Sequence, residues 1–269
     1  MKYCLSQVCT LPASFELDIE DFAAGGCQTI EVWLTKLEHF LESHSVEQAI
    51  ALLEEHNVQL PVASFQGGLL ASQGEKRKQH WDHWQHRLNI CQQLNIQTIV
   101  VACDVPGPAA ATDLQRIQES LKQLSRDAEQ AQVSVALEFQ ATAAFGNNLQ
   151  TAAALITQIP SPFIGLCFDA FHFFVGPSKL SDLEAVDPER LFHVQLCDLL
   201  DMPRELATDS DRILPGEGSV PLQDIAQWLK SIDYQRTVSI ELMNPQIWQV
   251  PPRQFSEVGL AALNQLFER

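Results

Sequence analysis

Four polar residues in the second half of the chain each end a short apolar run that is rich in β-branched side chains. Such a run is typical of a buried strand in a parallel sheet, where a carboxylate is costly unless a metal or a partner compensates it. If the strand ends meet, they form an oxygen-rich, anionic pocket that suits a hard divalent cation. The residues are Glu138, Asp169, Gln195 and Glu241.

Short apolar runs alternate with amphipathic stretches along the chain, and this alternation predicts repeated βα units. The eight runs span residues 3–8, 28–33, 58–64, 97–102, 133–138, 163–168, 191–196 and 237–241. Helical periodicity is clearest at residues 46–56, 113–131 and 222–232. The expected fold is therefore α/β, a (β/α)8 TIM barrel that forms one domain over residues 1–269.

An open, doubly wound sheet is the competing architecture. It normally carries a glycine-rich nucleotide loop after an early strand, and the glycine pairs at 25–26 and 67–68 lack the required spacing. The longest irregular stretch, residues 197–220, follows the run that holds Gln195, where a barrel places its functional loops.

The composition favours chemistry on small molecules. The 34 acidic and 17 basic residues give a net charge of -17, which repels the phosphate backbone of nucleic acids. The seven cysteines include no C-x-x-C pair and are expected to be buried free thiols in a reducing cytosol. Without a signal-peptide or membrane-spanning segment, we expect a cytoplasmic monomer or homodimer that binds neither nucleic acid nor membranes.

Two histidines are candidates for the same pocket as the carboxylates. His172 follows Asp169 by three residues, although a core role among the neighbouring phenylalanines is the alternative. His193 and Gln195 alternate by two, so both are expected to face the barrel interior. Residues 80, 83 and 86 are also histidines, but they recur at helical spacing in a charged segment and are interpreted as a solvated helix face.

Together, these motifs resemble the xylose isomerase-like barrel superfamily across essentially the whole chain. That group includes sugar isomerases and epimerases, inositol-catabolism enzymes, dehydroshikimate dehydratases and endonuclease IV. The motifs that carry the resemblance are Glu138, Asp169-Ala-Phe-His172, His193-Val-Gln195, Arg212-Ile-Leu-Pro-Gly-Glu-Gly218 and Glu241.

The resemblance implies a single divalent metal ion, Mn, Mg, Co or Zn, and a role for each matching residue. The implied metal ligands are Glu138, Asp169, Gln195 and Glu241. Glu138 and Glu241 are then expected to act as the base and conjugate-acid pair. His172 and Arg212 are expected to contact substrate oxygens, and Trp33 and His193 are further substrate candidates.

One residue departs from the pattern of the epimerases in this group. They usually have histidine where this chain has Gln195, and glutamine is similar to the dehydroshikimate dehydratase branch. We therefore expect an isomerase or epimerase that abstracts the proton alpha to the metal-bound carbonyl of a small polyhydroxy compound. A metal-dependent lyase of the 3-dehydroshikimate dehydratase type and a non-catalytic binding barrel are the alternatives. Endonuclease IV is disfavoured, because Ser64 and Asp104 stand where its three-metal site needs histidines.

Overall fold

The computed structural model describes residues 1–268, and its main sheet is a closed barrel. The strands follow the order β1-β10-β7-β6-β5-β4-β3-β2, which confirms the expected TIM barrel. Each expected run overlaps a strand: β1 (Lys2–Ser6), β2 (Thr29–Trp33), β3 (Gln59–Gln66), β4 (Thr98–Cys103), β5 (Ser134–Phe139), β6 (Ile164–Asp169), β7 (Leu191–Leu196) and β10 (Thr237–Ile240).

Helices separate most of the strands, and the three predicted helices end within two residues of α3, α5 and α8. The helices are α1 (Phe15–Ala24), α2 (Leu34–Leu41), α3 (Val46–Glu55), α4 (Gly74–Gln93), α5 (Ala111–Ala131), α6 (Leu149–Thr157), α7 (Ala170–Val175), α8 (Leu222–Ser231) and α9 (Pro252–Glu268). No helix in this described part of the chain is both long and apolar enough to cross a membrane.

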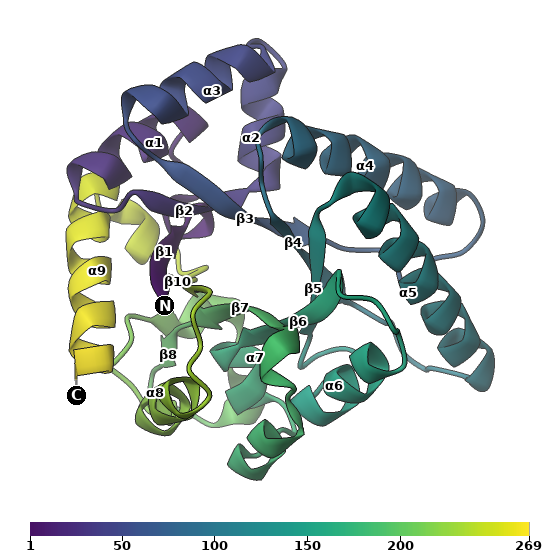
Figure 1. Ribbon diagram of the computed structural model, residues 1–269. Helices are drawn as coiled ribbons and strands as arrows, with labels where there is room; N and C mark the ends of the chain where they lie inside the picture. The colour runs from purple at the N-terminus through teal and green to yellow at the C-terminus, as the bar shows by residue number, and fades with distance from the viewer. Residues whose placement is uncertain (269) are drawn as a thin grey trace. The chain divides into compact units, whose positions relative to one another are not determined.

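The chain divides into two compact units, and the first, unit 1, combines Met1–Val62 with the residues from Val194 onward. Within it β1 pairs in parallel with β10 on one side and with β2 on the other, so that Leu5 lies between Ile240 and Ile30. Helices α1 and α9 pack against each other (Figure 1). Gly259 lets α9 approach β1 closely, because a Cβ atom there would lie 2.9 Å from the Leu5 side chain.

The second unit, unit 2, spans Ala63–His193. Its central strand β5 pairs in parallel with β4 and β6, and every residue of β4 and β6 is buried, as expected for parallel strands covered on both faces. Helices α4 and α5 lie side by side (Figure 1). The Trp84 indole donates to the Asp127 carboxylate at 3.0 Å and thereby joins these helices. That residues 1–269 act as one domain stays a prediction.

The first predicted strand is shorter than expected. Residues 3–8 were predicted as extended, but β1 ends at Ser6 and Gln7–Thr10 form a 3-10 turn. The turn is tied to other elements of unit 1 by side chains. Gln7 accepts from the backbone N–H of Trp33 at 3.1 Å, and Thr10 donates to Asp18 at 2.7 Å. These contacts join the turn to β2 and α1.

The stretch at 197–220 is not irregular throughout, which corrects its interpretation as a loop. It contains a small antiparallel pair, β8 (Asp198–Leu199) with β9 (Arg212–Ile213). The buried Asp198 carboxylate accepts backbone N–H groups from Leu199, Gly216 and Val220 at 2.9 to 3.0 Å. A single side chain thus accepts three backbone N–H groups in and beside the β8–β9 pair.

Candidate functional site

Three predicted site residues in unit 2 converge, and we call them the histidine cluster: Glu138, Asp169 and His172. One ligand atom from each lies within 4.8 Å of the other two, and all three residues are buried. Glu138 is the penultimate residue of β5, Asp169 ends β6, and His172 lies in the first turn of α7. Buried acceptors packed this closely are the kind of donor set that a divalent cation compensates.

Asp169 orients this cluster because it is also the N-cap of α7. Its Oδ1 atom accepts from the backbone N–H groups of Phe171 and His172 at 2.6 and 3.2 Å. The first N–H groups of a helix have no partner within the helix, so an N-cap carboxylate satisfies them and favours the positive end of the helix dipole. The same contacts fix the turn that carries His172.

The contacts of His172 favour a role as hydrogen-bond donor over a role as metal ligand. The backbone N–H of Ala141 donates to Nδ1 at 3.4 Å, so the neutral imidazole carries its hydrogen on Nε2. Phe171 packs against the imidazole edge to face, with ring centroids 5.4 Å apart. Phe171 and Phe173 are both buried, and Phe173 packs against Phe168, which assigns this pair of phenylalanines to packing.

Gln140 is a neighbour of Glu138 that the sequence analysis did not single out. Its Nε2 atom donates to Oε2 of Glu138. The signal was available, because residues two apart at a strand end share a face and an amide can steady a carboxylate there. Gln140 therefore helps to set the direction in which Glu138 presents its oxygens.

Three predicted residues of unit 1, Gln195, Arg212 and Glu241, lie in a continuous series of hydrogen bonds with Glu31 and Ser239, which we call the amide network. Ser239 donates through Oγ to Glu31, and the Gln195 amide nitrogen donates to Glu31 at 2.8 Å and to Glu241 at 2.9 Å. Arg212 donates through Nη1 to Glu241 at 3.0 Å. Every member is buried, and the positive charge of Arg212 offsets part of the negative charge of the two glutamates.

Arg212 is held in place by the ordered stretch after β7. Its guanidinium also pairs with Asp209 at 2.8 Å, and its backbone carbonyl accepts from the Asn244 side chain at 3.0 Å. Gly218 is required in this stretch, because a Cβ atom there would lie 2.1 Å from the Leu199 carbonyl oxygen. These contacts therefore fix the position of Arg212 within unit 1.

Glu31 gains a role that its sequence context did not reveal. At sequence level a helix N-cap or a loop salt bridge explained it as well as a functional site. The structure rejects the N-cap interpretation, since the N-cap of α2 is Trp33, and places Glu31 in the amide network. Its partners Gln195 and Ser239 lie 164 and 208 residues away in sequence, so no local pattern could identify them.

The structure places the two further substrate candidates without assigning their roles. Trp33 is half-buried at the end of β2, and His193 is fully buried within β7. A contact of either side chain with substrate stays a prediction.

The histidines of α4 divide into two groups. His83 and His86 are exposed, which agrees with the predicted solvated face. The prediction was wrong for His80, which is half-buried with Nδ1 2.9 Å from the Gly68 carbonyl oxygen. The left-handed φ of Gly68 (+77°) forms the turn after β3 where Asp104 also accepts the Gly68 N–H, at 2.7 Å. Burial raises the pKa of the Asp104 carboxyl.

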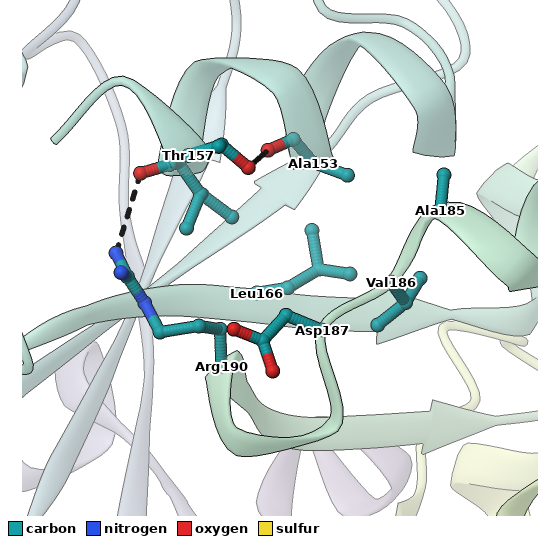
Figure 2. Close-up of a pocket in the computed structure, with 8 residues that line it drawn as sticks. Ala153, Thr157, Leu166, Ala185, Val186, Asp187 and Arg190 are labelled. Atoms are coloured by element: carbon teal, nitrogen blue, oxygen red, sulfur yellow. Dashed lines mark hydrogen bonds between the residues drawn. The ribbon is translucent and has the colours of Figure 1, made fainter.

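A cavity of about 100 Å³ in unit 2 lies away from these strand ends (Figure 2). Arg190 lines it and donates to the carbonyl oxygens of Ile164 and Ile156 at 2.6 and 3.3 Å. Ile164 is the first residue of β6, whereas Asp169 is the last. The N-terminal strand ends of a barrel serve stability, so this cavity is not the candidate site.

Known proteins resemble this chain over most of its length. The inosose isomerase of Halalkalibacterium halodurans is 29% identical over 259 residues, covering 93% of this chain and 90% of the relative. The inosose isomerase of Bacillus velezensis is 27% identical over 265 residues, covering 93% and 91%. A 3-dehydroshikimate dehydratase of Pseudomonas putida is 23% identical over 93% of this chain, which spans 39% of that longer protein.

A solved structure described as IolI protein with a binding zinc atom superposes with a TM-score of 0.92, at 23% identity, over 100% of this chain and 98% of the other. The family model described as xylose isomerase-like TIM barrel matches residues 19–266. These findings confirm the predicted fold and an enzyme of the isomerase class. This chain belongs to the xylose isomerase-like TIM barrel family.

Proposed function

We propose that this protein is a divalent-metal-dependent isomerase or epimerase of a small polyhydroxy carbonyl compound. The observation that carries the proposal is the pair of buried carboxylates in the histidine cluster, Glu138 and Asp169, which bring one oxygen atom each within 4.8 Å of the other. Relatives named inosose isomerases align with 93% of the chain, so cyclic polyhydroxy ketones of the inosose class are the first substrates to test.

We propose that Glu138, Asp169, Gln195 and Glu241 hold the metal ion. These residues lie within one residue of the C-terminal ends of β5, β6, β7 and β10, which are consecutive neighbours in the barrel order, and this adjacency supports the assignment. Their donor atoms are all oxygens, a set that favours Mg²⁺ or Mn²⁺ over Zn²⁺. The zinc atom named for the structurally similar IolI protein supports a metal in this fold.

Different side chains of this protein would carry out different steps of the reaction. A cation bound at these ligands supplies polarisation of the substrate carbonyl, which acidifies the neighbouring C–H bond. One of Glu138 and Glu241 accepts that proton and the other returns a proton to the substrate, an effect worth about 10²- to 10⁴-fold in rate. Nε2–H of His172 and the guanidinium of Arg212 donate hydrogen bonds to substrate oxygens as negative charge develops. Return of the proton to the adjacent carbon is isomerisation, and return to the opposite face is epimerisation.

A dehydratase is the second candidate, and Gln195 is the observation that favours it. Glutamine at this ligand position is the feature shared with the dehydratase branch, and a 3-dehydroshikimate dehydratase is among the relatives. Proton abstraction would be the same, but the β-hydroxyl group would leave as water and a C=C bond would form. The two functions therefore differ in the fate of one hydroxyl group.

A substrate panel in deuterated water tests both candidates. The purified protein, loaded with Mn²⁺, is incubated with inososes, free ketoses and dehydroshikimate, and NMR follows deuterium incorporation and products. An inosose or ketose that gains deuterium and rearranges supports the isomerase, whereas water loss from dehydroshikimate supports the dehydratase. Absence of exchange with every compound, together with no uptake of Mn²⁺, would leave the non-catalytic barrel as the better description.

A further inference from the structure

We propose that Glu31 is a positioning residue that fixes which atom Gln195 presents to the metal ion. This inference rests on the proposed function, since it assumes that Gln195 is a metal ligand. It concerns a residue in the middle of β2, three strands before the first proposed ligand in the chain. No proposed catalytic or metal-binding role involves Glu31.

The orientation of the Gln195 amide follows from its two partners. Nε2 lies 2.8 Å from Oε1 of Glu31 and 2.9 Å from Oε1 of Glu241. The reverse orientation would direct the carbonyl oxygen at two carboxylate oxygens, with no hydrogen between them. An amide NH₂ has two hydrogens, and each carboxylate can accept one. The covalent geometry of the amide then directs Oε1 away from both glutamates.

Glu31 is itself held in place, so it can fix another group. Ser239 donates through its hydroxyl to Oε2 of Glu31, while Oε1 accepts from Gln195. Glu31 and Ser239 are both fully buried, which removes competing water. Ser239 and Glu31 also lie on strands that flank β1, with Cys4 opposite Ser239 and Ser6 opposite Glu31 in the register.

Glu241 alone would not fix the orientation of the Gln195 amide in the same way. It is a proposed ligand that also accepts from Arg212, so its carboxylate has to serve several groups. Glu31 has no such competing role in the proposal and supplies the second acceptor of the amide. Residues that orient a metal ligand by a hydrogen bond typically contribute roughly 10- to 100-fold to metal affinity or activity.

Binding of Mn²⁺ to the full-length protein, measured by EPR of the free ion, tests this inference without relying on turnover. Glu31→Leu removes the acceptor at similar volume and is expected to weaken Mn²⁺ binding by about 10- to 100-fold. Glu31→Gln removes the charge but keeps an oxygen that accepts from Gln195 and an NH₂ group that can donate to Ser239. It is expected to bind Mn²⁺ more tightly than Glu31→Leu. Glu54→Gln, on the exposed face of α3, is the matched control and is expected to behave as wild type.

A second measurement keeps the test valid if Glu31→Leu fails to fold. The side-chain NH₂ resonances of Gln195, assigned by their loss in Gln195→His, are expected to resist exchange with water in the wild type and to shift in Glu31→Gln. Equal loss of Mn²⁺ binding in both Glu31 variants would overturn the inference, because it would show an effect of charge alone. Wild-type affinity in Glu31→Leu, or a freely exchanging Gln195 amide, would also overturn it. The proposed metal site fails separately if wild type and Glu138→Gln both take up no Mn²⁺.

Discussion

The histidine cluster of unit 2 and the amide network of unit 1 compensate buried negative charge in different ways. In the histidine cluster, short-range partners orient the groups: two backbone N–H groups at Asp169 and the amide of Gln140 at Glu138. In the amide network, a buried guanidinium and partners far away in sequence do so. The comparison shows that one cluster depends on local turns and the other on tertiary packing.

This difference predicts which substitutions damage the fold as well as the chemistry. A side chain of the amide network contributes hydrogen bonds across elements that meet only after folding. In the histidine cluster, Glu138 and Asp169 bond to groups only two or three residues away in sequence. The following predictions test this contrast, from the largest expected effect to the smallest.

Replacing the two proposed acid-base residues should separate chemistry from stability. Glu138→Gln and Glu241→Gln are each expected to lower kcat/KM by about 10²- to 10⁴-fold. Glu241→Gln also weakens the buried ion pair with Arg212, so it is expected to lower the free energy of unfolding further, by about 1 to 3 kcal/mol. Urea unfolding of both variants in metal-free buffer measures this difference, and equal stabilities would remove the contrast between the clusters.

Asp198→Ala should disrupt the segment of residues 197–220, which contains Arg212. Three backbone N–H groups lose their acceptor, so we expect a loss of about 3 kcal/mol in unfolding free energy, together with a higher KM. Asp198→Asn keeps one acceptor oxygen and should lose less. Urea unfolding and steady-state kinetics measure both effects, and a fully stable Asp198→Ala would contradict the role assigned to this carboxylate.

Asparagine should replace Asp169 as a helix cap but not as a metal ligand. Asn is as good an N-cap as Asp, so Asp169→Asn is expected to keep the stability of α7 while Mn²⁺ affinity falls at least about tenfold. Asp169→Ala should lose the cap as well, at a cost of about 1 kcal/mol. Calorimetric titration and thermal unfolding separate the two effects. Unchanged Mn²⁺ affinity in Asp169→Asn would exclude Asp169 as a ligand.

The smallest expected effect is the reactivity of the cysteines. All seven are free and buried, and burial raises the pKa of Cys103 to about 12 and that of Cys27 to about 11. At neutral pH these thiols stay protonated, so the native protein is expected to react slowly with a thiol-specific chromogenic reagent and fully only when unfolded. Mass spectrometry of partially labelled protein shows whether the thiols of one unit react first, which would show that the units open separately.

The sequence predicted the strands well because a buried parallel strand is a local signal. Its apolar run and the polar residue that ends it are adjacent, so Glu138, Asp169 and His172 could be selected together. Long-range partners were not accessible in this way. Glu31 looked ambiguous because its significance depends on Gln195 and Ser239, and His80 looked solvated because the turn at Gly68 was not recognised.

The position of Gln195 between two carboxylates also limits how this family can diversify. A residue there needs a donor for Glu31 or Glu241 and, on the same head group, an acceptor for the cation. Glutamine and neutral histidine both meet this requirement, whereas an ionised glutamate meets only half of it. The codons for glutamine and histidine differ only at the third nucleotide, so one nucleotide change replaces an oxygen ligand by an imidazole, which zinc accepts more readily.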